Sequence, residues 1–112
     1  MLIKAEAENE INGPSSAAID AINILRRRAN TDEISSSLSQ DELRDIIHNE
    51  WTLELSFELK RRINLVRWGE LDSVLSNNER SQGGYEPFKK YFPIPQSEFD
   101  SGLDPSLQNP GY

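Results

Sequence analysis

The sequence predicts an all-α protein made of helical hairpins, followed by an irregular, proline-rich tail. Apolar residues recur at helical spacing through about the first 75 residues. Ser39 stands three positions before Glu42, a pattern typical of the capping box that begins a helix. The segment from Tyr91 to Tyr112 holds four of the six prolines, which disfavours regular helix there and favours an extended chain.

The first two helices are expected to form a hairpin. The first runs from the opening residues to Asn12-Gly13-Pro14, which is a typical C-terminal stop. The second spans about Ser16 to Ala29, and one of its faces carries mostly small side chains that allow another helix to approach closely: Ala18, Ala21, Ile22, Leu25 and Ala29. Because the sequence begins within a helix, without a capping residue before it, we expect further sequence upstream.

A third helix is expected from Ser39 to about Lys60. Asp41 and Glu42 suit the positive end of its dipole. At about 100° per residue, one face collects apolar side chains, with Trp51 at its margin: Leu43, Ile46, Ile47, Leu53 and Phe57. The single histidine, His48, falls on the polar side and is expected to be solvated.

Glu50 and Glu54 project from the middle of this apolar face. Carboxylates there lose their hydration on packing, so they need partners. Arginines at the end of the second helix and after the third can supply them, and the favoured interpretation is a structural Glu–Arg network: Arg26, Arg27, Arg28, Arg61, Arg62 and Arg67. Glu54→Ala is expected to leave a buried arginine without its ion-pair partner and to lower the free energy of unfolding by about 3 to 5 kcal/mol.

Two chemical alternatives for Glu50 and Glu54 are disfavoured. A glycosidase needs two acids flanking a cleft, and abundant arginine would keep both carboxylates ionised. A carboxylate-bridged metal site pairs Glu with His three residues later, whereas His48 precedes Glu50 by two. Phosphate-binding glycine loops, serine elbows and cysteine nucleophiles are missing from the sequence. We therefore expect a protein that is not an enzyme, without cofactor or metal.

Composition restricts the partners. The 112 residues carry a net charge of −7, which argues against nucleic acid as a partner. The lack of cysteine excludes disulfides and thiolate chemistry. A chain of this length suits one small domain. We expect a helical part over residues 1–75, with a loop and docked tail of the same domain over 76–112.

The tail is expected to dock rather than to remain disordered, because it carries apolar anchors: Tyr91, Phe92, Ile94, Phe99, Leu103 and Leu107. Before it, the segment 76–87 has the composition of a loop, and a short helix is expected to end near the Asn77-Asn78 pair. At the end, Pro110 fixes its own φ and Gly111 permits a sharp bend. This turn would point Tyr112 back at the protein.

Three ordered motifs resemble the C-terminal part of the SusD/RagB family: "NEWTLELSFELKRRINLVRWGEL", "YFPIPQSEF" and the final "QNPGY". "AEAENEINGPSSAAIDAINILRRRA" is similar to the helical hairpin that precedes them in that family. The residues that match the family pattern, taken as structural motif residues, are Glu50, Leu53, Glu54, Leu55, Glu58, Arg61, Leu65, Arg67, Trp68, Gly69, Pro93, Pro95, Asn109, Pro110, Gly111 and Tyr112. The chain departs from the pattern at four positions. Trp51 stands where the family has Arg, and Leu59 where it has Gly. Arg62 stands where the family has an aromatic residue, and Asn64 where it has Asp.

The resemblance implies an α-helical scaffold of tetratricopeptide-like hairpins in a surface-exposed, glycan-binding lipoprotein of the outer membrane. It implies capture of oligosaccharides and their delivery to a SusC-like TonB-dependent transporter, the family's partner. Family members are several times longer, and their ligand-binding residues are expected mostly outside this chain. Trp51 and Trp68 are therefore expected to pack in the core rather than to stack on sugars.

Two other functions stay open on the sequence. A free-standing helical adaptor would bind a protein or peptide in the groove of its hairpins. A glycosidase built on Glu50 and Glu54 ranks third and requires that Glu54→Gln abolish sugar hydrolysis with the fold intact. A true translational start at Met1 would favour the adaptor, whereas an upstream reading frame with more helices would favour the SusD-like protein.

Overall fold

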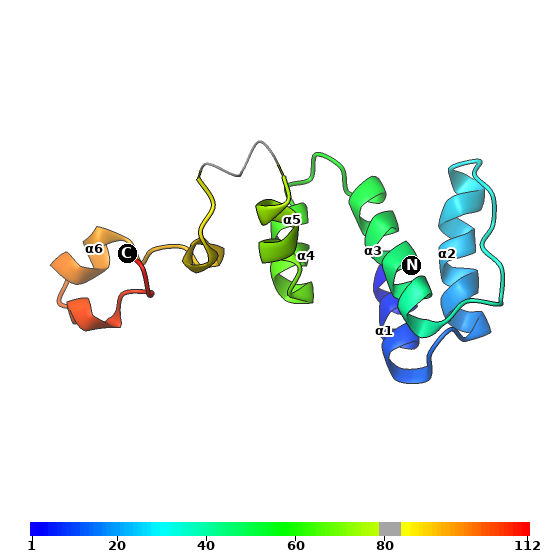
Figure 1. Cartoon of the computed structure of the whole chain (residues 1–112), viewed down its shortest axis with the longest axis horizontal. Coiled ribbons are helices and arrows are strands. Elements are labelled where there is room, and N and C mark those ends of the chain that lie inside the picture. Colours follow the sequence, from blue (N-terminus) through cyan, green and yellow to red (C-terminus); the bar gives the residue numbers. More distant parts are fainter. Residues whose placement is uncertain (79–83) are drawn as a thin grey trace. The chain divides into compact units, whose positions relative to one another are not determined.

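A computed structural model describes residues 1–78 and 84–112. Helices dominate it, and no strand occurs in these two ranges, so the predicted all-α class is confirmed (Figure 1). The chain divides into two compact units, Met1–Arg61 and Arg62–Tyr112, which are described separately below. The expected organisation as one domain, with parts 1–75 and 76–112, stays a prediction.

Three helices build the first unit, namely α1 (Leu2–Asn12), α2 (Ser16–Arg28) and α3 (Gln40–Glu54). Figure 1 shows them side by side, and α1 contacts both of the others. The predicted hairpin is confirmed: α1 stops at Gly13, whose φ of 73° suits a residue without a Cβ. The Ser15 hydroxyl then accepts a hydrogen bond from the Ala18 amide and begins α2.

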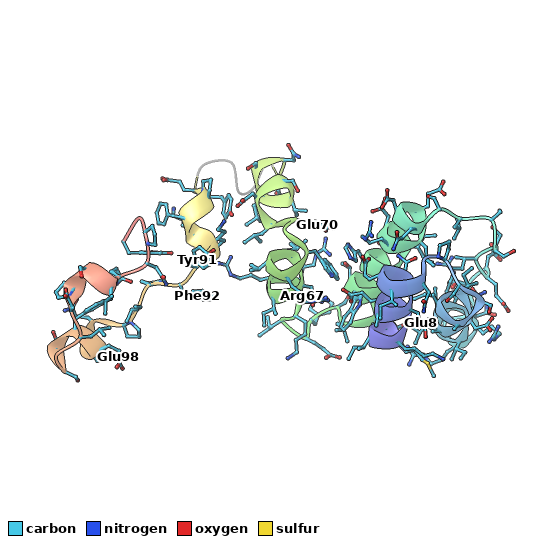
Figure 2. All side chains as sticks on the ribbon, turned by 90° about the horizontal axis from the view of Figure 1, so that it is seen from below. Glu8, Arg67, Glu70, Tyr91, Phe92 and Glu98 are labelled. Atoms are coloured by element: carbon cyan, nitrogen blue, oxygen red, sulfur yellow. The ribbon has the colours of Figure 1, made fainter. Side chains whose placement is uncertain are left out.

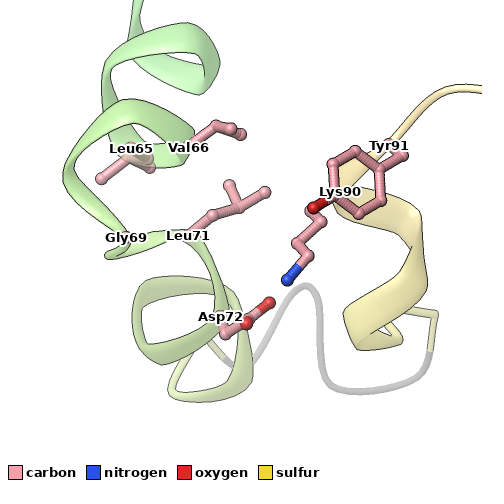
Figure 3. A pocket seen from close by; sticks show the side chains of 7 residues that line it. All are labelled: Leu65, Val66, Gly69, Leu71, Asp72, Lys90 and Tyr91. Atoms are coloured by element: carbon pink, nitrogen blue, oxygen red, sulfur yellow. The ribbon is translucent and has the colours of Figure 1, made fainter.

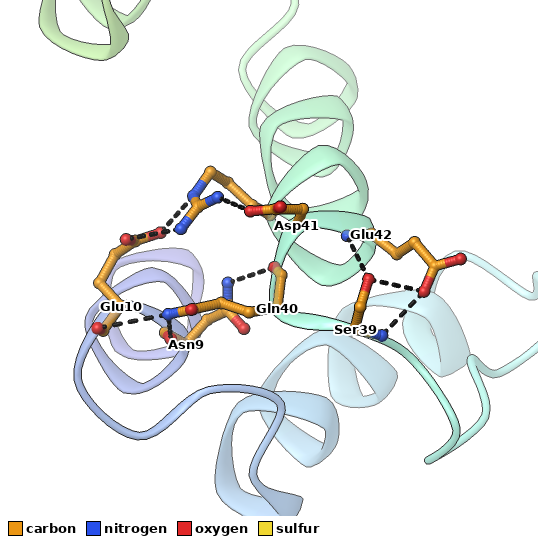
Figure 4. Close-up of polar contacts among 7 residues, drawn as sticks. Asn9, Glu10, Ser39, Gln40, Asp41 and Glu42 are labelled. Atoms are coloured by element: carbon orange, nitrogen blue, oxygen red, sulfur yellow. Dashed lines mark hydrogen bonds and ion pairs between the residues drawn. The ribbon is translucent and has the colours of Figure 1, made fainter.

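The predicted capping box of α3 is also confirmed. The Ser39 hydroxyl accepts from the Glu42 amide at 3.2 Å, and the Glu42 carboxylate accepts from the Ser39 amide at 2.8 Å (Figure 4). These bonds satisfy two amides that a helix start otherwise leaves without partners. The first turn of α3 is thereby fixed, which orients the rest of the helix against α1.

The core of the first unit is made of small and branched side chains from all three helices: Ala5, Ala18, Ile19, Ala21, Ile22, Leu25, Leu43 and Ile47. Trp51 is partly buried and packs against this cluster, in agreement with its predicted core position. Alanines on α1 and α2 let the two backbones approach closely, which explains the tight hairpin.

Three expectations about α3 are wrong. The helix ends at Glu54 rather than near Lys60, and Leu53 and Phe57 are 61% and 102% exposed instead of buried. Phe57 and Leu59 take positive φ values of 68° and 58°, which a helix cannot continue through. His48 is buried rather than solvated. Because α3 packs against both α1 and α2, it buries a broader arc than a single apolar stripe predicts.

The second unit consists of short elements. These are α4 (Arg61–Trp68), whose first residue closes the first unit, α5 (Leu71–Ser76), the 3-10 turn η1 (Pro87–Lys90), α6 (Gln96–Asp100) and the 3-10 turn η2 (Pro105–Leu107). Gly69, with φ of 75°, makes the turn between α4 and α5. The predicted last helix near the Asn77-Asn78 pair is α5. Residues 79–83 of the predicted loop lie outside the described residues.

The proline-rich tail is more helical than predicted. Proline was expected to exclude helix, yet it occupies the first position of η1 and of η2 and directly precedes α6. A first-turn amide has no helical acceptor, so proline loses nothing there and its fixed φ favours the turn. The predicted anchors divide into two groups: Ile94, Phe99 and Leu103 are half-buried, whereas Tyr91, Phe92 and Leu107 are 50%, 72% and 59% exposed (Figure 2 labels Tyr91 and Phe92).

Candidate functional site

Glu50 is held by the last turn of α2. Arg26 Nη1 donates to Glu50 Oε1 at 2.5 Å, and Arg26 Nε donates to the carbonyl oxygen of Asp32 at 2.5 Å. The side chains of Glu50 and Arg26 are 8% and 24% exposed. One guanidinium therefore joins α2, α3 and the connection between them, and it compensates the buried carboxylate.

Glu54, about one turn after Glu50 on α3, pairs with Arg28, which lies two residues after Arg26 on α2. Arg28 is 67% exposed, so the expected orphaning of a buried arginine on removal of Glu54 is wrong for this pair. Arg61, expected near these carboxylates, donates instead to the Thr52 hydroxyl. Glu58 is exposed. The two ion pairs form a ladder across α2 and α3, of which the Glu50 rung is the buried one.

A second polar cluster joins α1 to the start of α3 (Figure 4). Asn9, which is fully buried, donates to the Gln40 carbonyl at 3.0 Å, and the Gln40 side-chain amide donates back to the Asn9 carbonyl at 2.6 Å. Arg44 holds Glu10 with two bonds, at 2.6 Å and 2.9 Å, and also contacts Asp41. The hydrogen bonds between Arg44 and Glu10 favour the charged form of each group, so they lower the pKa of Glu10 and raise the pKa of Arg44.

The carboxylates considered for catalysis or metal binding are engaged in ion pairs. Both expected acids, Glu50 and Glu54, are bound by arginine. Across residues 1–78 and 84–112, no three His, Asp or Glu side chains lie close enough together to hold a metal ion. The two ion pairs fix α2 and α3 against one another.

The terminal turn of the second unit is docked on the segment after η1. The Asn109 side chain donates to the Phe92 carbonyl at 2.7 Å, and the Tyr112 hydroxyl donates to the Tyr91 carbonyl at 3.0 Å. The Tyr112 ring meets Phe88 edge to face at 5.0 Å between centroids. Gly111 has φ of 95°, and a Cβ there would overlap the Phe88 ring. The terminal turn thus bends back as expected, onto Phe88 and Tyr91 of the second unit, while docking on the body of the protein stays a prediction.

Gln108 holds the stretch between Pro93 and Pro95. Its side-chain oxygen accepts from the Ile94 amide at 2.8 Å, and its side-chain nitrogen donates to the Ile94 carbonyl at 3.1 Å. Prolines on both sides keep this stretch from adding to a helix. The two family motifs that contain these residues are thus bonded to each other, although the sequence separates Ile94 and Gln108 by 14 positions.

A pocket of about 190 Å³ lies between the α4–α5 turn and η1 (Figure 3). Its lining includes Gly69 from the expected motif, whereas Arg67 places its guanidinium 5.2 Å from the Trp68 ring and is not among the lining residues. Sequence reasoning missed the polar lining residues Asp72 and Lys90. No spacing pattern joins them, because they are brought together only when η1 folds back against α5.

Comparison with known proteins identifies the class. The model of the SusD family matches residues 1–112, and the chain belongs to that family. SusD-like proteins are, as a family, non-catalytic glycan-binding proteins associated with the outer membrane.

Two curated relatives come from Formosa agariphila. The chain is 39% identical to SusD-like protein P2 over 121 aligned positions, covering 100% of this chain and 24% of the relative. It is 35% identical to SusD-like protein P25, covering 99% of this chain and 23% of the relative. The chain thus spans about a quarter of the length of these relatives. No solved structure matches it significantly. Within the described ranges, none of the helices combines the length and the apolar character needed to span a bilayer.

Proposed function

We propose that this chain is the C-terminal portion of a longer SusD-like protein, which captures oligosaccharides at the outer membrane and delivers them to a SusC-like TonB-dependent transporter. The observation that carries the proposal is the match of all 112 residues to the SusD family, together with coverage of only 23% to 24% of two SusD-like relatives. Capture requires binding and release, with no bond in the glycan broken.

The proposed role of the first unit is mechanical. The buried Arg26–Glu50 pair, the capping box and the reciprocal Asn9–Gln40 bonds keep α1, α2 and α3 in one arrangement. Such a support suits a binding protein, because a preformed surface loses less conformational entropy when the ligand binds. The main oligosaccharide surface is proposed to lie in the remainder of the longer protein, which is anchored at the cell surface.

The test uses the longer reading frame, expressed with its partner transporter. Isothermal titration with oligosaccharides from several polysaccharides should give saturable binding, and the transporter should co-purify with the SusD-like protein. Intact oligosaccharide recovered after incubation is the expected result for a protein without hydrolytic activity.

Two other outcomes would contradict the proposal. Released monosaccharide that disappears in Glu54→Gln would support the glycosidase instead. A demonstrated translational start at Met1, with no oligosaccharide bound, would support the free-standing adaptor.

A further inference from the structure

The pocket of the second unit has an apolar floor and a polar, partly aromatic rim. Leu65 and Leu71, which are 3% and 4% exposed, form the floor, and Gly69 contributes a wall without a side chain. Figure 3 shows Lys90 and Tyr91 on the η1 side, facing Leu71 and Asp72 on the helical side. Its volume of about 190 Å³ is below the 300 to 1,000 Å³ range typical of drug-sized ligands, so the pocket suits one small ring.

Three side chains of the rim bear the chemistry. The Asp72 carboxylate accepts the Tyr85 hydroxyl and keeps further acceptor capacity on its two oxygens. The Lys90 ammonium, 5.3 Å from the centre of the Tyr91 ring, offers donors. Tyr91 is half exposed, so its ring is accessible to a ligand. An acceptor, a donor and an aromatic face thus border one small cavity.

The charges of this rim restrict the ligand. Among the lining residues, one carboxylate and one ammonium balance each other, which favours a neutral ligand over a phosphate or a simple cation. The nearby Arg62 guanidinium donates to the carbonyl oxygens of Lys89 and Lys90 and does not line the pocket. A ligand that carries both hydroxyl groups and a face of C–H groups can use all three side chains, with hydroxyls on Asp72 and Lys90 and the C–H face on Tyr91. Sugar rings combine these two features.

We propose that this pocket binds a single neutral sugar ring, as a small saccharide subsite within the C-terminal portion. The inference rests on the proposed function in one respect, because a glycan captured by the longer protein would supply the ring. The binding is reversible and makes no covalent bond. Pocket size and the few polar contacts place the dissociation constant for a free monosaccharide on the order of 1 to 10 mM.

The experiment titrates the full 112-residue chain, labelled with ¹⁵N, with methyl β-D-glucopyranoside, methyl β-D-galactopyranoside and methyl α-D-mannopyranoside separately. At least one should shift the amide signals of Asp72, Lys90 and Tyr91 in a saturable manner. Tyr91→Ala should weaken that binding by about three- to tenfold, and Asp72→Asn by about tenfold. Absence of saturable shifts with every sugar would overturn the proposal.

Matched controls separate the pocket from its surroundings. Phe92→Ala removes the neighbouring aromatic ring, which is 72% exposed and does not line the pocket, and should leave the affinity unchanged. Tyr85→Phe leaves Asp72 in place and should change the affinity less than Asp72→Asn does. Lys90→Met keeps the length of the side chain, and full affinity in this variant would contradict the proposed role of its ammonium.

The free amino acid glycine serves as a competing probe. As a zwitterion it can bind the Asp72 carboxylate and the Lys90 ammonium, but it needs no aromatic face. Binding of glycine that survives Tyr91→Ala, without sugar binding, would overturn the saccharide assignment. Oligosaccharide titration of the longer protein distinguishes the two proposals. If the longer protein binds glycans and Tyr91→Ala and Asp72→Asn change nothing, the subsite fails while the proposed function stands.

Discussion

The two compact units are held together by different kinds of interaction. In Met1–Arg61, eight buried apolar side chains from three helices form one cluster. In Arg62–Tyr112, only Leu65 and Leu71 are buried apolar residues among those described, and side chains bonded to the backbone join the elements. The comparison teaches that periodic apolar faces supply most of the packing between amphipathic helices, with a few buried polar pairs added, whereas short irregular elements depend mainly on specific polar side chains at specific positions.

The largest expected effect is a loss of stability in the first unit, and it is compared with the loss from one matching substitution in the second unit. Leu43→Ala, in the middle of the cluster, should destabilise α1–α3 by about 3 to 4 kcal/mol, because it removes fully buried carbon and leaves a cavity. Leu71→Ala borders an existing pocket that water can enter, so its cost should be about 2 kcal/mol.

Amide hydrogen exchange in α1–α3 and in α4–α5 measures the two losses. Leu53→Ala, at a 61% exposed position, is the control and should change stability by less than about 0.5 kcal/mol. Equal losses for Leu43→Ala and Leu71→Ala would contradict the distinction between a continuous core and an open one.

The next effect concerns the two rungs of the ion-pair ladder. Glu50→Ala should cost about 2 kcal/mol, since it leaves the mostly buried Arg26 without its carboxylate. Glu54→Ala should cost less than about 1 kcal/mol, because Arg28 is largely solvated. Urea unfolding of the two variants gives the difference, and a larger loss for Glu54→Ala would refute the assignment of the buried rung.

Gly111→Ala should disturb the second unit locally. An added Cβ would overlap the Phe88 ring, and a φ of 95° is strained for alanine, so the terminal turn should be weakened by about 1 to 2 kcal/mol. The loss of contacts between the Phe88 and Tyr112 rings in nuclear Overhauser spectra is the measurement. Gly102→Ala, also at positive φ but with open space around it, controls for strain alone.

Leu59→Gly is expected to stabilise the first unit by about 1 kcal/mol. Leu59 has φ of 58° and is 90% exposed, so glycine relieves backbone strain and sacrifices almost no burial. Thermal unfolding against Glu58→Gly, a neighbour without positive φ, isolates the effect. Equal midpoints for the two variants would show that the left-handed conformation carries no strain.

Much of the fold could be predicted from sequence because its signals are local. Gly13, Ser39 and Glu42 mark helix ends within one turn, and Gly111 marks the terminal bend. The end of α3 could not be predicted, since residues 55–60 contain neither glycine nor proline. The left-handed Leu59 stands where the family pattern has glycine, so the resemblance carried a signal that composition lacked.

The candidate site was less predictable for a physical reason. A single apolar stripe on α3 predicts a solvated His48, but two neighbouring helices contact α3 and His48 is buried. From the sequence, the partner of Glu50 could be restricted to one of six arginines. Which of them pairs with Glu50 depends on how α2 and α3 are aligned, and in the structure it is Arg26. Asp72 and Lys90 meet only through chain folding, and no periodicity encodes such a meeting.

The bonds between Gln108 and Ile94 also protect the tail from unwanted association. The side-chain amide of Gln108 carries both N–H donors and an accepting oxygen, so it can bond the N–H and the C=O of Ile94 at once, as a neighbouring strand would. Pro93 and Pro95 lack amide protons. From Pro93 to Pro95, the backbone therefore presents no free N–H to another chain, and this apolar stretch cannot act as a template for intermolecular β-pairing.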